Sequence, residues 1–133
     1  MSTERINLEV PATPSALSVV RRVLGGLGSR LGYSLDDLED LYLATDGLLG
    51  AALGYEPLEW VRIAMVVASD DLRLTVGTFT SPRLRGEVAA QVQACDGIDL
   101  CRLLHRTMDE VLVADAGDTF DVVLVRRHRE VRP

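Results

Sequence analysis

The chain has 133 residues, of which 47% are hydrophobic and 26% are charged, a balance typical of one globular domain. Twenty acidic residues against fourteen basic ones give a formal net charge of −6, which argues against binding to a nucleic-acid backbone. No run of about 18 uncharged apolar residues is present, and the start of the chain is too charged for a signal peptide. We therefore expect a cytoplasmic protein that binds neither nucleic acid nor membrane.

All basic residues are arginine, and asparagine occurs once, at Asn7. Without lysine, the chain has no residue for a Schiff base or for the phosphate-binding lysine of P-loop proteins and ordinary protein kinases. Cys95 and Cys101 form no disulfide framework, and we expect them to be small buried residues. His105 and His128 lack the spacing of a zinc site. These absences exclude much enzyme chemistry.

Alternating apolar residues predict a strand over residues 6–10, which ends at Pro11. Thr13 and Pro14 then indicate an N-cap followed by proline in the first turn of a helix. This helix has an apolar stripe spaced three and four residues apart, made of Leu17, Val20, Leu24, Leu27 and Leu31. Its three glycines indicate close packing against a neighbouring element.

A second helix begins after Ser34, because Ser34 and Asp37 have the spacing of a capping box. Gly54 is the predicted end. The buried face of this helix is predicted to consist of Leu38, Leu41, Tyr42, Thr45, Leu49 and Ala52.

Residues 60–68 and 72–77 are predicted to form a hairpin. Residues 79–97 form a connection with a short helix at about 87–94. A third apolar stripe predicts a helix over residues 100–108, and residues 110–114 and 120–125 form a closing hairpin. From Arg126 onward the chain is predicted to be a polar tail.

The predicted order is β-α-α-β-β-α-β-β, with hairpins joining most strands. It indicates an α+β fold, a two-layer sandwich with a mostly antiparallel sheet covered by helices on one face. We expect one domain over residues 1–133, with its core at about 6–127.

Short segments of this order resemble a known family, namely Ile6–Ala12, Leu31–Tyr33, Asp36–Leu41 and Met108–Val111. Together with the element order, they are similar to the ATPase fold of DNA gyrase, heat-shock chaperones and histidine kinases (the GHKL superfamily). The closer resemblance is to its bacterial anti-sigma-factor serine kinases. The resemblance implies a histidine-kinase-like ATPase fold and a role in regulating transcription.

In that family, a Glu and an Asn four residues apart on the second helix serve magnesium and catalysis. The family pattern places Gly47 at the Glu and Ala51 at the Asn, and Asp46 lies one residue off, about 100° around the helix. Asn7 lies in the first strand and cannot replace the missing Asn. The resemblance therefore implies a degenerate magnesium site.

Two further family motifs are also missing. Residues 78–81 follow the second hairpin strand without the Asp that reads adenine, and the glycine-rich phosphate turn before the last helix keeps Gly97 but has a carboxylate at Asp99. A carboxylate beside a triphosphate is repulsive. We therefore expect no cofactor, and we assign no catalytic residue and no metal ligand.

The acidic run Asp36, Asp37, Glu39 and Asp40 has two interpretations, a metal or docking cluster and a solvated first turn favoured by the helix dipole. We favour the solvated turn.

Other isolated residues also favour structural roles. Asp115 and Asp118 are better explained by a hairpin turn than by calcium, and no partner activates His105 as a general base. Trp60 is predicted to pack in the core, with an interface aromatic as the alternative.

Arg21 and Arg22 lie between the stripe residues Val20 and Leu24, so at least one of them is expected to project from the apolar face. In the resembled family, an arginine on this helix contacts the partner protein. Two interpretations stay open for the pair, a partner-binding surface and a solvated surface.

The sequence thus predicts a non-catalytic, anti-sigma-factor-like protein that binds a sigma factor or an anti-sigma antagonist, as a homodimer. One alternative is an active ATP-dependent serine kinase with relocated nucleotide ligands. Another is a dimerisation module or a sensor of a small ligand.

Overall fold

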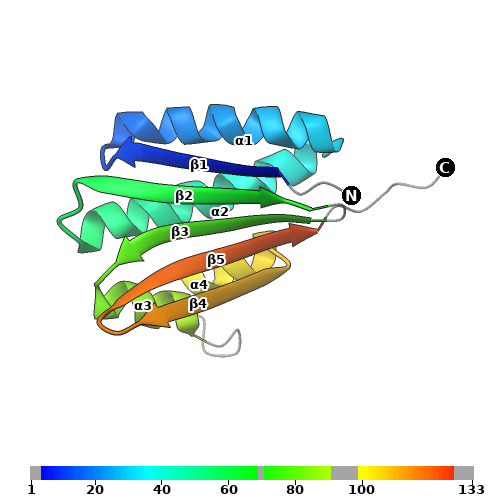
Figure 1. Cartoon of the computed structure of the whole chain (residues 1–133). Coiled ribbons are helices and arrows are strands. Elements are labelled where there is room, and N and C mark those ends of the chain that lie inside the picture. The colour runs from blue at the N-terminus through cyan, green and yellow to red at the C-terminus, as the bar shows by residue number, and fades with distance from the viewer. Residues whose placement is uncertain (1–3, 69–70, 91–98, 128–133) are drawn as a thin grey trace.

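The structure is a computed structural model that describes residues 4–68, 71–90 and 99–127. Five strands form one antiparallel sheet in the order β1-β2-β3-β5-β4 (Figure 1). The strands are β1 (Glu4–Pro11), β2 (Trp60–Val67), β3 (Asp71–Phe79), β4 (Glu110–Ala116) and β5 (Thr119–Arg127). The helices are α1 (Leu17–Leu31), α2 (Leu35–Tyr55), α3 (Pro82–Ala89) and α4 (Leu100–Thr107), with a 3-10 helix at Pro14–Ala16.

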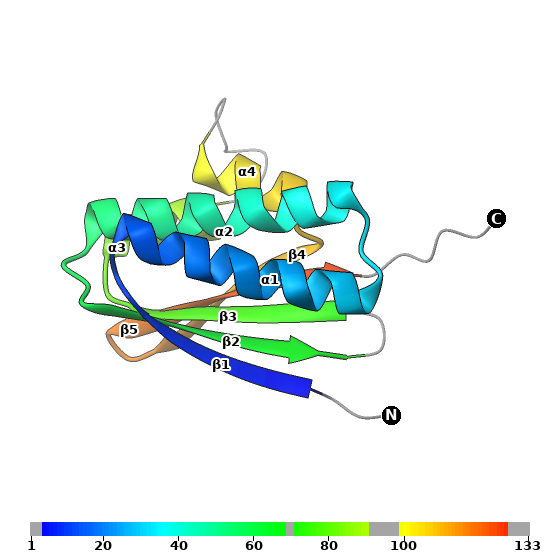
Figure 2. The ribbon, with the colours of Figure 1, turned by 90° about the horizontal axis from the view of Figure 1, so that it is seen from above.

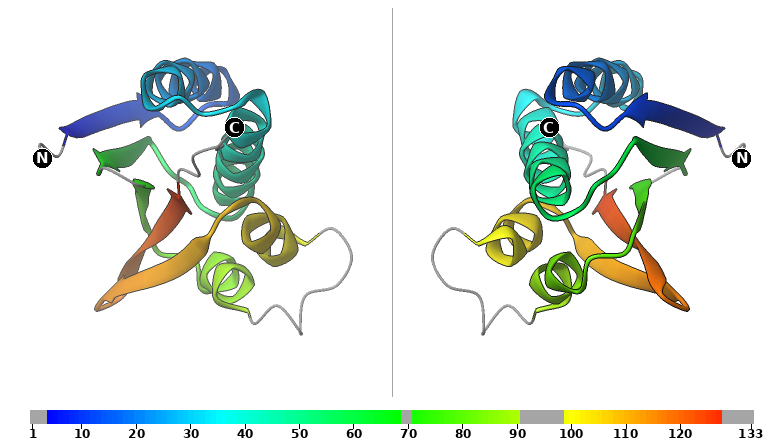
Figure 3. Two further views of the ribbon diagram at one scale, coloured as in Figure 1. Left: turned by 90° about the vertical axis from the view of Figure 1, so that its right-hand side faces the viewer. Right: turned by 90° about the vertical axis from the view of Figure 1, so that its left-hand side faces the viewer.

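The helices α1 to α4 all lie on one face of the sheet, and no described element covers the other face (Figures 2 and 3). Hairpins join β2 to β3 and β4 to β5, so these neighbours run antiparallel. This arrangement confirms the predicted α+β sandwich.

The core lies between the sheet and the helices. Alternate residues of each strand point into it, as the period of two requires, and in β2 these residues are Val61, Ile63 and Met65, each at most 3% exposed. From the helices, Leu24 and Leu48 are fully buried against them.

Two glycines of α1 allow α2 to approach closely, as predicted. A Cβ on Gly28 would overlap the side chain of Leu38, and a Cβ on Gly25 would lie 2.6 Å from the hydroxyl oxygen of Tyr42. A larger residue at either position would require the side chain of Leu38 or Tyr42 to move.

The capping box at the start of α2 is also confirmed. The Ser34 hydroxyl accepts a hydrogen bond from the Asp37 amide, and the Asp37 carboxylate accepts one from the Ser34 amide, each at 3.1 Å.

The short helix predicted at residues 87–94 is misplaced. Helix α3 begins at Pro82, because the Ser81 hydroxyl accepts a hydrogen bond from the Leu84 amide at 3.1 Å and proline fits the first helical position. Gly86 lies inside this helix on an open side. Residues 91–98 lie outside the described residues.

The closing hairpin is longer than predicted. Its strands extend to a tight turn at Gly117, whose φ of 67° favours glycine. The predicted tail from Arg126 is wrong, because Arg126 and Arg127 continue β5.

The prediction for Trp60 is wrong, since its side chain is 54% exposed. Trp60 pairs with Pro11 and shares the phase of Arg62, which places it on the sheet face without helices.

Cys101 is buried, as predicted, but it is disulfide-bonded and not a free thiol. A short spacing between cysteines does not exclude a local bridge. Cys95, the other cysteine of the sequence, lies outside the described residues.

Candidate functional site

The middle of α2 is where the family resemblance places magnesium and the triphosphate. A Cβ on Gly47 would lie 2.5 Å from Cδ2 of Leu103 and 3.6 Å from Cδ1 of Leu100, both on α4. Ala51, one turn on, is half-buried and packs against the core. Aliphatic side chains of α4 therefore occupy the space in front of Gly47.

Asp46, the nearest acid to that position, is directed away from α4. It forms an ion pair with Arg21 of α1, and the Arg21 guanidinium lies 4.7 Å from the centre of the Tyr42 ring. The carboxylate of Asp46 is thus held between α1 and α2 and does not replace the missing Glu.

The segment after β3, where the family has its adenine-reading Asp, is held by Glu56. One oxygen of the Glu56 carboxylate accepts hydrogen bonds from the Thr80 and Ser81 amides. The other, Oε2, is buried and has no hydrogen-bond partner among the described residues. Glu56 is 8% exposed and fixes the C-terminal end of α2 to the start of α3. No sequence pattern indicates this contact, because an acid beside Pro57 is ordinarily exposed.

The start of α4 corresponds to the family's phosphate turn. Asp99 is the N-cap residue of α4, and Gly97 lies outside the described residues. With leucines in front of Gly47 and a carboxylate at the N-terminus of α4, the described residues do not fit a magnesium–nucleotide complex.

Arg126 joins the ends of three elements on the helix-covered side. Its guanidinium contacts Asp37 at 2.5 Å and Asp40 at 3.1 Å in α2, and it donates to the Thr107 carbonyl of α4 at 2.8 Å. Burial raises the pKa of Asp37, but hydrogen bonds from Arg126 and Ser34 outweigh it and lower that pKa below its ordinary 3.8.

Burial and the nearby Asp37 also raise the pKa of Tyr33 to about 12, and the Tyr33 hydroxyl donates to the Arg126 carbonyl at 3.1 Å. The solvated-turn prediction therefore holds for Asp36 and Glu39, which are exposed, and is wrong for Asp37 and Asp40, which are half-buried.

Both Arg21 and Arg22 are exposed, so neither enters the apolar face of α1, contrary to expectation. The buried stripe of α1 runs through Val20, Leu24 and Leu27. At about 100° per residue, Arg22 lies opposite this stripe and Arg21 lies beside it, toward α2. Arg21 is bound to α2, whereas Arg22 has no ion pair or hydrogen bond within the described part of the chain.

The remaining candidates have structural surroundings. Asp115 forms a two-bond ion pair with Arg85 of α3, at 2.8 and 2.7 Å, and these hydrogen bonds lower its pKa. His105 is half-buried on α4. Across residues 4–68, 71–90 and 99–127, no group of three or more acidic, His or Cys side chains is placed to hold a metal.

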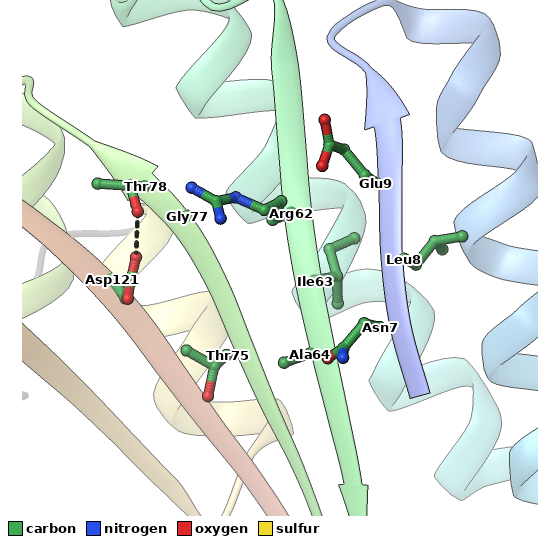
Figure 4. A pocket seen from close by; sticks show the side chains of 10 residues that line it. All are labelled: Asn7, Leu8, Glu9, Arg62, Ile63, Ala64, Thr75, Gly77, Thr78 and Asp121. Carbon is green, nitrogen blue, oxygen red and sulfur yellow. Dashed lines mark hydrogen bonds between the residues drawn. The ribbon is translucent and has the colours of Figure 1, made fainter. Parts of the chain in front are cut away.

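A hollow of about 550 Å3 lies on the sheet face without helices (Figure 4). It runs across β1, β2 and β3 to Asp121 of β5, and Asn7, Glu9 and Arg62 contribute polar groups to it. The Asp121 carboxylate accepts a hydrogen bond from the Thr78 hydroxyl at 3.0 Å. Sequence reasoning missed this site, because alternating strand residues only indicate an exposed face.

Comparison with known proteins decides the family. A serine-protein kinase RsbW of Bacillus pumilus is 35% identical over an alignment of 135 positions, gaps included, which covers 89% of this chain and 83% of that protein. The chain belongs to the RsbW family. A serine-protein kinase RsbW of Bacillus velezensis is 32% identical over 120 residues, 90% of this chain and 54% of that protein. The chain thus spans about half the length of this relative.

A solved structure agrees with the fold. The RsbU and RsbW domains of Rv1364c from Mycobacterium tuberculosis match 97% of this chain and 34% of that chain with a TM-score of 0.67, at 16% identity. No protein-family model matches the sequence. None of the described helices of this RsbW-family chain is long and apolar enough to cross a membrane.

Proposed function

We propose that this protein is a non-catalytic member of the RsbW family that regulates transcription by binding a sigma factor or a related switch protein. The observation that carries the proposal is the short distance between Leu103 and the Cβ that any other residue would have at position 47, which is 2.5 Å to Cδ2 of Leu103. The position implied for the catalytic Glu has no side chain, and Leu103 of α4 occupies the space that the first atom of one would need.

The proposed mechanism is steric. The protein covers surfaces of its partner that transcription requires, and no phosphoryl transfer is needed. Arg22 on α1 is free to pair with a carboxylate of the partner, and Arg21 beside it extends the same surface. We propose a homodimer as the working unit.

Nucleotide binding separates this proposal from an active kinase. We expect no binding heat and no rise in melting temperature with millimolar ATP and magnesium, because a ligand stabilises a protein only in proportion to its occupancy. A dissociation constant below about 100 μM, roughly 5.5 kcal/mol of binding free energy, would contradict the loss of the nucleotide site.

Partner binding tests the surface. Purified sigma factors of the source organism are titrated against the wild type and against the double variant Arg21→Ala/Arg22→Ala. If the pair anchors the partner, the double variant loses about 1–4 kcal/mol of binding free energy. The matched control is Arg102→Ala/Arg106→Ala, which removes two exposed arginines from α4 and leaves binding unchanged. Equal affinity of wild type and Arg21/Arg22 variant shows that the partner docks elsewhere.

A further inference from the structure

Helix α4 begins without the side-chain cap that starts its neighbours α2 and α3. The Ser34 hydroxyl caps α2 and the Ser81 hydroxyl caps α3, whereas Asp99, the N-cap residue of α4, forms no side-chain cap hydrogen bond. Helix α4 is only eight residues long, and a helix of this length is marginal without support from outside. The start of α4 therefore depends on other contacts.

A covalent bond lies at this point of the chain. Cys101, the second residue of α4, is 2% exposed and disulfide-bonded. Cys95 is the only other cysteine of the sequence, so the bridge joins two residues six positions apart. A disulfide that closes a short loop constrains the unfolded chain less than one that closes a long loop. One such bridge is also not the multiple-bridge framework of a small secreted domain. Its position at the start of α4 is therefore more informative than its effect on overall stability.

The surroundings of Cys101 also suit a reduced thiol. The Sγ atom of Cys101 lies 3.2 Å from the carbonyl oxygen of Ala90, the C-cap residue of α3. A thiol at this position can donate a hydrogen bond to that oxygen, whereas a disulfide sulfur has no hydrogen to donate. Arg83 and Gly86 of α3, together with Asp99 and Cys101, line a hollow of about 310 Å3. Cys101 thus adjoins a space that a small thiol can enter, and its site accommodates both states of the sulfur.

We propose that the disulfide of Cys101 is a reversible thiol–disulfide exchange site that sets how firmly α4 covers the middle of α2. Its substrates are thiols, either two monothiols such as glutathione or one dithiol. A first thiolate attacks one sulfur of the bridge and forms a mixed disulfide, and a second thiolate displaces the chain from it. The two thiols become one disulfide, and Cys95 and Cys101 receive two electrons and two protons.

The link from Cys101 to α2 runs through the first turn of α4. Leu100 precedes Cys101 and Leu103 follows it by two residues, and both lie in front of Gly47. Once the bridge is open, this turn has neither a side-chain cap nor a covalent bond to hold it, so it unfolds locally more often. The two leucines then leave the region in front of Gly47 for part of the time. Neither a nucleotide nor a sigma factor takes part in the exchange, so it goes beyond the proposed function.

Hydrogen exchange of the oxidised and reduced chain tests this switch. The protein is equilibrated in glutathione buffers of increasing reduced-to-oxidised ratio, and its free thiols are counted by alkylation and mass spectrometry. We expect the bridge to open and close reversibly across this series, in which a purely structural bridge stays closed. In the reduced chain, the amides of α4 should exchange about tenfold faster, beginning with Leu103, whose amide donates to the Asp99 carbonyl at 3.0 Å. The amides at the start of α2, which the Ser34 capping box holds, should keep their exchange rates.

Two variants remove the bridge by different routes. Cys101→Ser keeps a hydroxyl that can donate to the Ala90 carbonyl, and Cys95→Ser leaves Cys101 as a thiol. Both should show the α4 exchange rates of the reduced wild type in every buffer. Thermal unfolding shows whether each variant is folded, and either folded variant is sufficient for the test. A bridge that stays closed in all glutathione buffers, or that does not form in any of them, overturns the exchange site. A bridge that opens without faster exchange in α4 overturns its control of α4.

Discussion

The middle of α2 and the sheet face without helices differ in whether other side chains of the protein cover them. Leu100 and Leu103 of α4 occupy the space in front of Gly47. The sheet face without helices has a hollow at Arg62, whose guanidinium forms no ion pair or hydrogen bond with the described residues. Leucines thus lie against the region where the family resemblance places a small ligand, whereas the hollow on the sheet has no role assigned by the resemblance. The contrast favours a protein that recognises other protein surfaces.

The largest effect on stability is expected for a buried side chain of α2, in comparison with an exposed side chain on the sheet face without helices. Leu48→Ala removes a fully buried side chain of α2 and should lower the free energy of unfolding by about 2–5 kcal/mol. Leu112→Ala on the sheet face without helices should lower the free energy of unfolding by less than about 1 kcal/mol. Urea unfolding at low protein concentration measures the free energy of unfolding of both variants. Equal losses would show that Leu112 belongs to the core.

Gly47→Ala tests the closure of α2 by α4. The new Cβ meets the end of Leu103, so we expect a loss of about 1–3 kcal/mol in the free energy of unfolding. Leu103→Ala in the same chain should recover part of the loss that Gly47→Ala causes. The matched control is Gly50→Ala, whose Cβ meets nothing within 4 Å and should stabilise α2 by about 0.5–1 kcal/mol. A stabilising Gly47→Ala would mean that the space in front of α2 is free.

Sequence reasoning was most successful where periodicity decides the structure. The alternation in β1 and the capping box of Ser34 each depend on neighbouring residues, so the faces of β1 and the start of α2 were predictable. It failed where contacts join distant segments. Arg126 meets Asp37 across 89 residues, and Glu56 meets Ser81 across 25, with no local pattern to indicate either contact.

The site followed the same division. The family resemblance assigned Gly47 and Ala51 to the magnesium motif from the sequence, because the assignment depends only on spacing along one helix; the loss of that motif stays a prediction. The occupation of the space in front of Gly47 by Leu103 could not be predicted, since it depends on how α4 crosses α2. Trp60 was misplaced for a related reason, because an apolar strand does not indicate which of its two phases faces the helices.

Asp37→Asn tests the ion-pair network that joins α2 to β5. Near neutral pH we expect a loss of about 1–2 kcal/mol, because a charged hydrogen bond to Arg126 is weakened. The folded pKa of Asp37 lies below its ordinary 3.8, so its contribution is complete above the unfolded pKa and is lost as the pH falls through the folded value. As the pH falls below about 4, the unfolding free energy of Asp37→Asn should therefore fall less steeply than that of the wild type. Parallel acid curves would show that Arg126 does not hold Asp37 ionised.

The smallest effects on stability are expected for the two arginines of α1. Arg21 makes contacts within the chain and Arg22 makes none with the described residues, so the two variants compare an occupied side chain with an available one. Arg21→Ala loses an exposed ion pair with Asp46 and a contact with the Tyr42 ring, together about 0.5–1 kcal/mol. Arg22→Ala loses no described contact and should change the unfolding free energy by less than about 0.5 kcal/mol. In sigma-factor binding the order should reverse, because Arg22 can pair with a partner carboxylate without first breaking an internal contact. Chemical denaturation and titration calorimetry on the two single variants measure both orders, and a larger binding loss for Arg21→Ala would assign the partner contact to Arg21.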